Sequence, residues 1–187
     1  MQPTLQTQRL ILRPFELTDG EDVRRLAGEW AIADTTLQIP HPYEVGMAEE
    51  WILTRGPRFE AGEEVVFAIV LREPGQLIGA MGLVIEAQFR RAELGYWIGR
   101  LHWGHGYCTE AGKAVLEYGF HSLNLNRIHA YHFKRNPASG RVLRKLGMKH
   151  EGSALQHIMK WGVFEDVELY GIIRSQWQRA KGPPESA

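Results

Sequence analysis

Short apolar runs with the length and composition of strands recur along the chain, bounded by turn-forming residues. They predict strands at residues 9–13, 65–71, 77–85, 92–98, 128–133 and 167–173. Pro14 ends the first run, and the segment 73–76, Glu-Pro-Gly-Gln, joins the second run to the third as a hairpin. Three strands in a row, 65–98, therefore predict an antiparallel meander in the middle of the chain.

Helical spacing of apolar residues fills the intervals between these runs. Thr18 with Glu21 fits a capping box, which predicts that a helix begins there. A second helix fits residues 44–60, although Gly56 and Pro57 favour an early break. A third helix follows residue 106, and a fourth spans 136–146 and ends at a glycine. The order of elements predicts a mixed α/β or α+β domain rather than a strictly alternating parallel fold.

Length and composition narrow the class of protein. The chain has 187 residues with 22 basic and 22 acidic side chains, and 44% of its residues are hydrophobic. These values predict one folded domain over residues 1–180 and a flexible tail at 181–187. Zero net charge argues against a nucleic-acid partner. The lack of a long apolar run or a signal-like N-terminus predicts a cytoplasmic protein without a membrane partner. Whether it acts alone or as a homodimer is left open.

The segment 103–111, Trp-Gly-His-Gly-Tyr-Cys-Thr-Glu-Ala, carries the most chemical information. Two glycines lie between a predicted strand and a predicted helix, where backbone amides and the helix dipole favour an anion such as phosphate. A tight loop without a ligand explains the same residues. The Walker pattern is missing, and Thr109 stands where a dinucleotide fingerprint has its third glycine.

Three blocks of the sequence together resemble the GNAT superfamily of N-acetyltransferases, in particular its Rim-type (RimJ/RimL-like) branch. The first block is residues 7–14, Thr-Gln-Arg-Leu-Ile-Leu-Arg-Pro. The second joins residues 93–98 to the glycine loop, and the third runs from the Asn-Pro-Ala-Ser of residues 136–139 to residues 145–148. The resemblance covers nearly the whole chain. It implies a central, mostly antiparallel sheet of about seven strands with one splayed parallel pair, flanked by about four helices.

The resemblance also implies acetyl-CoA as the co-substrate. It assigns the pyrophosphate loop to Trp103, Gly104, His105, Gly106, Tyr107, Cys108 and Thr109. Trp103 and Cys108 depart from the family pattern, which has Gln or Arg and a small residue there. The end of a splayed strand at Ile98 would offer backbone groups to the pantetheine, with Asn136 and Ser139 beside it. Arg141 would contact the CoA phosphates or lie on a solvated face.

The implied chemistry is direct attack of a neutral amine on the thioester. Glu93 is the candidate base, or else a structural partner of Arg90 or Arg91. Many relatives protonate the leaving thiolate with a tyrosine, but Leu143 stands at that position. Ser139 is the nearest substitute, unless its hydroxyl serves a turn or the pantetheine; Tyr131 also stays open.

Two other chemistries receive little support from the sequence. The single cysteine, Cys108, excludes internal disulfides and a cysteine metal cage, and it lacks a committed base for an acetyl-cysteine intermediate. His102, His105, His129 and His132 lack the spacing and carboxylates of a metal site, so no metal is expected.

The amine acceptor is the least determined part. The favoured acceptor is the α-amine of a protein N-terminus, of the ribosomal-protein type. The alternatives are a small-molecule amine (a polyamine, an aminoglycoside or an amino-acid derivative) and a non-catalytic acyl-CoA-binding module. Trp161, Phe164, Glu165 and Asp166 would lie on one rim of the acceptor groove, where the acidic groups would attract a cationic amine.

Overall fold

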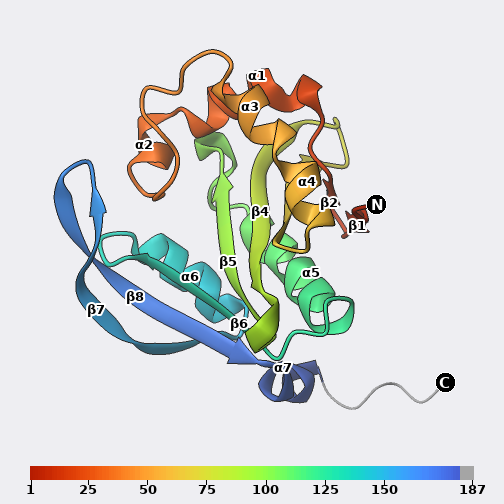
Figure 1. Ribbon diagram of the computed structural model, residues 1–187, viewed down its shortest axis with the longest axis vertical. Helices are drawn as coiled ribbons and strands as arrows, with labels where there is room; N and C mark the ends of the chain where they lie inside the picture. The colour runs from red at the N-terminus through yellow and green to blue at the C-terminus, as the bar shows by residue number, and fades with distance from the viewer. Residues whose placement is uncertain (182–187) are drawn as a thin grey trace.

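Eight strands form a single sheet in the order β1-β2-β3-β4-β5-β6-β8-β7 (Figure 1). The computed structural model describes residues 1–181. The strands are β1 (Leu5–Gln6), β2 (Leu10–Arg13), β3 (Glu64–Leu71), β4 (Leu77–Glu86), β5 (Arg91–Ile98), β6 (Arg127–Phe133), β7 (Lys149–Lys160) and β8 (Val163–Ile173). Only β5 and β6 are parallel neighbours. The expected mixed, mostly antiparallel sheet is confirmed, with one strand more than the expected seven.

Helices cover both faces of the sheet. They are α1 (Gly20–Ala27), α2 (Trp30–Ala33), α3 (Met47–Leu53), α4 (Arg55–Glu60), α5 (Tyr107–His121), α6 (Pro137–Lys145) and α7 (Arg174–Lys181). Residues of α5, α6 and α7 share one buried cluster with the central strands. Residues of α1 and α3 share a second cluster with β3 and the start of β4. The sheet therefore separates two apolar layers, to which strands β2 to β6 and β8 supply buried residues.

Two helix predictions were wrong in detail. The capping box forms between Glu16 and Asp19 instead of Thr18 and Glu21. Asp19 is held there by Arg13, whose two terminal nitrogens donate to its carboxylate at 2.7 and 2.8 Å. The helix expected over 44–60 is two helices, α3 and α4, which meet at Thr54. Pro57 has no N–H to give to the carbonyl four residues back, so one continuous helix cannot form.

Several elements had no counterpart in the predictions. These are β1, the short helix α2, strand β7 as a separate element, and α7. Lys181, expected in a flexible tail, is the last residue of α7, and the rest of that tail, 182–187, lies outside the described residues. Over residues 1–181, no helix is both long and apolar enough to cross a bilayer.

The parallel strands β5 and β6 diverge soon after they pair (Figure 1). Their pairing stops at Glu93 and His129, after three registered residues. Yet β5 continues against β4 as far as Ile98, and β6 continues against β8 as far as Phe133. The splayed pair that the family resemblance implied is therefore present. The facing backbone edges of residues 94–98 and 130–133 are not paired with each other, and a ligand can bind such groups.

Candidate active site

A glycine loop turns the chain from β5 into helix α5. Gly104 and Gly106 have φ angles of +79° and +81°, a region that side chains with a Cβ rarely adopt. Gly106 is the residue before the helix, and the first helical bond runs from Glu110 N to Gly106 O. The amides of the first three helical residues, 107–109, therefore have no carbonyl partner within the helix. They lie at the positive end of a 15-residue helix, as an anion site requires.

The N-terminal segment anchors this loop. Thr7 Oγ1 and the Arg9 backbone amide donate to Glu110 Oε1 at 2.6 and 2.8 Å, and Arg9 Nε donates to Glu110 Oε2 at 2.7 Å. Arg9 also donates to the His105 carbonyl and lies over the Tyr107 ring. Arg9 and Glu110 were not among the predicted site residues. The signal was available, because Thr7 and Arg9 belong to the first block of the family resemblance.

Trp103 joins the end of β5 to the loop. Its indole Nε1 donates to the Ile98 carbonyl at 2.6 Å. This contact gives a physical reason for a tryptophan where the family pattern has Gln or Arg. It also means that the Ile98 carbonyl has a partner already, so we expect the other backbone groups of the splayed edge to meet the pantetheine.

The N-terminus of α6 faces β5 across the splay. Asn136 Oδ1 caps the helix by accepting from Ser139 N at 3.3 Å. The Ser139 hydroxyl lies 2.7 Å from the Tyr96 hydroxyl of β5. Leu143, one turn further along the helix, is fully buried in the core and brings no hydroxyl. Arg141 is exposed on the same helix.

Glu93 lies at the point where β5 and β6 part, with its side chain 39% exposed. His129 Nε2 is 3.8 Å from its carboxylate, and the Tyr131 hydroxyl hydrogen-bonds to it. Burial and the nearby Glu86 raise the pKa of Glu93, while the Tyr131 hydrogen bond opposes that shift. Burial raises the pKa of Tyr131 to about 12. Glu93 therefore combines partial access with a raised pKa, as a general base requires.

The alternative partners of Glu93 are engaged elsewhere. Arg91 forms a two-pronged ion pair with Glu86, at 2.8 and 2.7 Å. Arg90 donates to the Asn124 carbonyl. A structural ion pair between Glu93 and either arginine is therefore not formed.

Cys108 packs its side chain into the core below the loop. Burial raises the pKa of this thiol to about 12, so the thiolate needed by a nucleophile is scarce at neutral pH. Among residues 1–181 no group of three or more His, Cys, Asp or Glu side chains is placed to hold a metal ion.

Helix α2 and the loop after it meet the β7–β8 hairpin and form an arch. Trp30 stacks on Trp161 with ring centroids 4.8 Å apart. Lys160 donates to the carbonyls of Leu37 and Ile39 at 3.1 and 2.9 Å. Trp161, one of the two aromatic residues expected on the rim, thus helps to hold two distant segments together.

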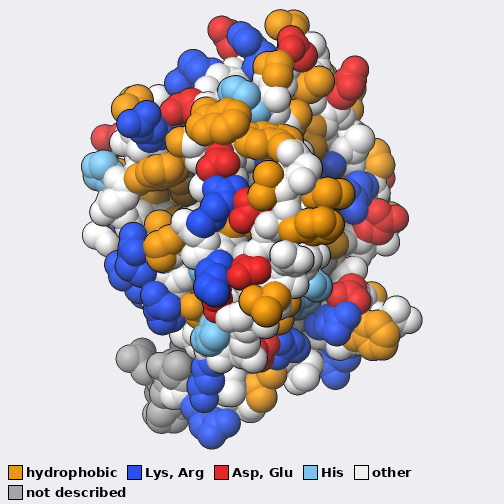
Figure 2. Space-filling view, turned by 90° about the vertical axis from the view of Figure 1, so that its left-hand side faces the viewer, with side chains coloured by type: hydrophobic (Ala, Val, Ile, Leu, Met, Phe, Trp, Pro, Cys, Tyr) orange, Lys and Arg blue, Asp and Glu red, His pale blue; other side chains and the backbone are white. Residues whose placement is uncertain are grey.

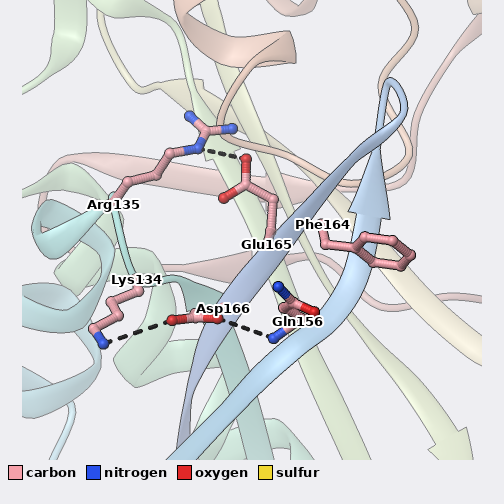
Figure 3. A pocket seen from close by; sticks show the side chains of 6 residues that line it. All are labelled: Lys134, Arg135, Gln156, Phe164, Glu165 and Asp166. Carbon is pink, nitrogen blue, oxygen red and sulfur yellow. Dashed lines mark hydrogen bonds and ion pairs between the residues drawn. The ribbon is translucent and has the colours of Figure 1, made fainter.

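A hollow of about 400 Å³ lies beside this arch, between the turn after β6 and the hairpin (Figure 3). It is lined by Lys134, Arg135, Gln156, Phe164, Glu165 and Asp166. Arg135 pairs with both Glu165, at 2.8 Å, and Asp34 of the arch, at 2.7 Å. Asp166 pairs with Lys134 at 3.6 Å and accepts from Gln156 N.

The acidic residues expected on the rim are therefore ion-paired, with Arg135 shared by Glu165 and Asp34. Glu165, Asp166 and Asp34 each have a cationic partner. On the face turned toward the viewer in Figure 2, acidic side chains are scattered among basic and hydrophobic ones. Among the described residues that border this hollow, no carboxylate is left without an ion pair for a polycation.

Comparison with known proteins assigns the chain to one family. Residues 9–149 match the model of the acetyltransferase (GNAT) domain family. The chain is 33% identical over 177 residues to a protein named uncharacterized N-acetyltransferase p20 from Bacillus licheniformis, covering 93% of this chain and 98% of that protein. The chain belongs to the GNAT acetyltransferase family, and it is an acetyltransferase.

Two further relatives differ in the acceptor that their names state. The [ribosomal protein uS5]-alanine N-acetyltransferase of Escherichia coli is 26% identical over 188 residues, or 92% of each chain. A solved chimera of the spermidine N-acetyltransferase SpeG from Vibrio cholerae and hSSAT has a TM-score of 0.76 and 25% identity, and the match covers 90% of this chain and 97% of that one.

Proposed function

We propose that this protein transfers the acetyl group of acetyl-CoA directly to the α-amine of a protein N-terminus. The observation that carries the proposal is the position of Glu93, a half-buried carboxylate at the point where the two parallel strands part. A thioester held in the splay and an amine arriving on the exposed side would both be near this group.

The donor proposal rests on two features of the fold. The amides of residues 107–109 and the two glycines before them fit a pyrophosphate, because they combine unpaired N–H donors with a backbone free of Cβ atoms. The unpaired edges of the splay fit the amide-rich pantetheine arm, which can bind them as a guest strand does. An N–H on that edge can also stabilise negative charge that develops on the thioester oxygen.

Glu93 is proposed to take the proton of the attacking amine, directly or through water. An α-amine has a pKa near ~7.7–8.0, whereas that of lysine is ~10.4, a gap worth about 3.5 kcal/mol near neutral pH. Even with its raised pKa, a carboxylate is a weak base, so it suits the α-amine better than the lysine side chain.

The charges of the rim support the proposed acceptor class. Because Asp34, Glu165 and Asp166 are paired with Arg135 or Lys134, a polyamine or aminoglycoside gains little attraction there. A peptide with one cationic group needs no such cluster. The name of the uS5-alanine relative agrees with a protein N-terminus as the acceptor. The name of the SpeG chimera agrees with the competing class, a polyamine.

One competition experiment tests the proposal. The purified protein is incubated with acetyl-CoA and a short peptide that has a free N-terminus and an internal lysine, with spermidine in a parallel reaction. Thiol release measures turnover, and tandem mass spectrometry locates the acetyl group. We expect acetylation of the α-amine, faster as the pH rises from about 7 to 8. Acetylation of the lysine alone, or turnover of spermidine without turnover of the peptide, contradicts the proposed acceptor.

A further inference from the structure

A hydrogen bond crosses the splay from β5 to the first turn of α6. The Tyr96 hydroxyl lies 2.7 Å from Ser139 Oγ and 3.3 Å from the Ser139 carbonyl oxygen, although 43 positions separate the two residues in sequence. Tyr96 belongs to the part of β5 that has left β6, on the face packed against the cluster of α5 and α6. The pair therefore closes one side of the space between the diverging strands.

The Ser139 hydroxyl is free of its usual local role. A serine in the first turn of a helix commonly bonds back to the backbone near the cap. Here Asn136 Oδ1 already accepts from the Ser139 amide. Within residues 1–181 the hydrogen bonds of Ser139 Oγ go only to Tyr96. Tyr96 is thus the hydrogen-bond partner of the Ser139 hydroxyl at the edge of the donor site.

The helix supplies no other hydroxyl toward the splay at this level. Leu143, one turn after Ser139, is fully buried among apolar residues. Tyr170 lies near but accepts a hydrogen bond from Arg144 at 2.9 Å. Burial raises the pKa of the Tyr96 phenol, and the neighbouring Cys108 adds to that shift. The phenol keeps its proton across the pH range of an assay.

We propose that Tyr96 is a positioning residue that directs the O–H of Ser139 toward the sulfur of the departing CoA. The proposal rests on the acetyl-CoA-dependent transfer proposed above. A serine oxygen has two acceptor lone pairs and one proton. Tyr96 donates to the Ser139 carbonyl at 3.3 Å, and when it shares the same proton with one lone pair of Ser139 Oγ, the Ser139 proton is left to donate into the splay.

The step balances without a proton relay. The new bond joins the amine nitrogen to the acetyl carbon, and Glu93 takes the proton that the nitrogen releases. The carbon–sulfur bond breaks with its electron pair on sulfur. Ser139 donates a hydrogen bond to that thiolate and keeps its proton, and solvent protonates the released thiolate to give the CoA thiol. Charge-assisted hydrogen bonds of this kind are stronger than neutral ones. The contact therefore stabilises the negative sulfur that forms during cleavage more than it stabilises the neutral thioester sulfur.

A double-mutant cycle with Tyr96→Phe and Ser139→Ala tests the proposal, with the peptide above as acceptor. Tyr96→Phe removes only the phenol oxygen, so the apolar ring stays in place. We expect kcat to fall about tenfold in Tyr96→Phe and somewhat more in Ser139→Ala, with acetyl-CoA affinity within about twofold. The double variant should be no slower than Ser139→Ala, because Tyr96 acts through Ser139. Tyr118→Phe is the matched control, because Tyr118 lies on α5 and packs edge-on against Phe67 of β3.

The outcomes separate this proposal from the one it rests on. Losses that multiply in the double variant, or an unchanged kcat in Tyr96→Phe, overturn the role of Tyr96 while the transfer reaction stands. A fall in acetyl-CoA affinity or melting temperature that accounts for the whole loss in Tyr96→Phe also overturns it. Failure of the unaltered protein to acetylate any amine overturns the transfer itself.

Discussion

Arg9 and Glu110, 101 positions apart in sequence, form an ion pair in which Nε and Nη2 of the arginine each lie 2.7 Å from Glu110 Oε2. This pair holds the start of helix α5 in place. The same carboxylate accepts hydrogen bonds from Thr7 Oγ1 and the Arg9 amide. The Arg9 side chain also donates to the His105 carbonyl inside the glycine loop. A carboxylate near a helix N-terminus is also favoured by the helix dipole. The first strand of the sheet and the donor loop are thereby one structural unit.

Glu110→Gln should destabilise the fold in a pH-dependent way. Burial raises the pKa of Glu110, but the hydrogen bonds from Thr7 and Arg9 outweigh it and leave the pKa below the ordinary value of 4.5. A carboxyl group whose pKa is lower in the folded state stabilises the fold at a pH above its unfolded-state pKa. This stabilisation is lost as the pH falls through the folded-state pKa. Urea unfolding should therefore show a deficit of about 1–3 kcal/mol at pH 7 that shrinks below pH of about 4.5. A deficit that is equal at pH 7 and pH 4 would contradict the assigned ion pair.

Gly106→Glu should abolish most acetyl-CoA binding. The position has a φ of +81°, and a Cβ there would lie 3.6 Å from Arg9 Nη2. The substitution therefore adds backbone strain and places a carboxylate beside the amides of residues 107–109, which we expect to bind an anion. We expect the dissociation constant from titration calorimetry to rise roughly 30-fold or more.

Gly62→Glu is the control for that experiment. Gly62 has a φ of +72°, with open space around it, in the turn between α4 and β3. The same backbone strain should leave acetyl-CoA affinity unchanged there. Equal acetyl-CoA affinities in the two folded variants would contradict the assignment of the glycine loop to the donor site.

Glu93→Gln should lower kcat roughly 10²-fold while acetyl-CoA affinity is kept. The pH profile gives a second check, because Glu86 contributes to the raised pKa of Glu93. In Glu86→Gln that repulsion is gone, so the acid limb of kcat should move to lower pH. An acid limb that stays in place, or a Glu93→Gln variant as active as the unaltered protein, would leave Glu93 a structural residue.

Cys108→Ala should retain most activity at a modest cost in stability. The thiol packs in the core and burial raises its pKa to about 12, so the side chain acts as a small apolar group. Chemical unfolding should show a loss of about 1 kcal/mol. Loss of turnover in the variant, or an acetyl group on Cys108 in intact-protein mass spectra, would point to a covalent intermediate instead.

The sequence allowed the regular parts of this structure to be predicted better than its contacts. Strand runs such as 65–71 and 92–98 came within a residue of β3 and β5, because period and turn residues are local signals. The glycine loop, Ser139 and Glu93 were found by resemblance to a family. The ion pairs of Arg9 with Glu110 and of Arg135 with Glu165 join residues that no local pattern connects. The ion pairing of the acidic rim was missed for the same reason, since its cationic partners come from the turn after β6.

The arch over the acceptor side gives the last prediction. Trp30 and Trp161 stack at 4.8 Å although their side chains are 57% and 46% exposed, so the contact joins two surface segments rather than a core. Such aromatic pairs contribute about 0.5–1.5 kcal/mol beyond the area they bury. Trp161→Ala should loosen the arch, raise KM for the peptide acceptor several-fold to tenfold, and leave KM for acetyl-CoA unchanged, because the glycine loop is anchored separately by Arg9. Val163→Ala, also exposed beyond the turn of the same hairpin, is the matched control. Steady-state kinetics with each substrate varied in turn distinguish the effects. Equal increases in both KM values would mean that the arch supports the whole site rather than the acceptor side.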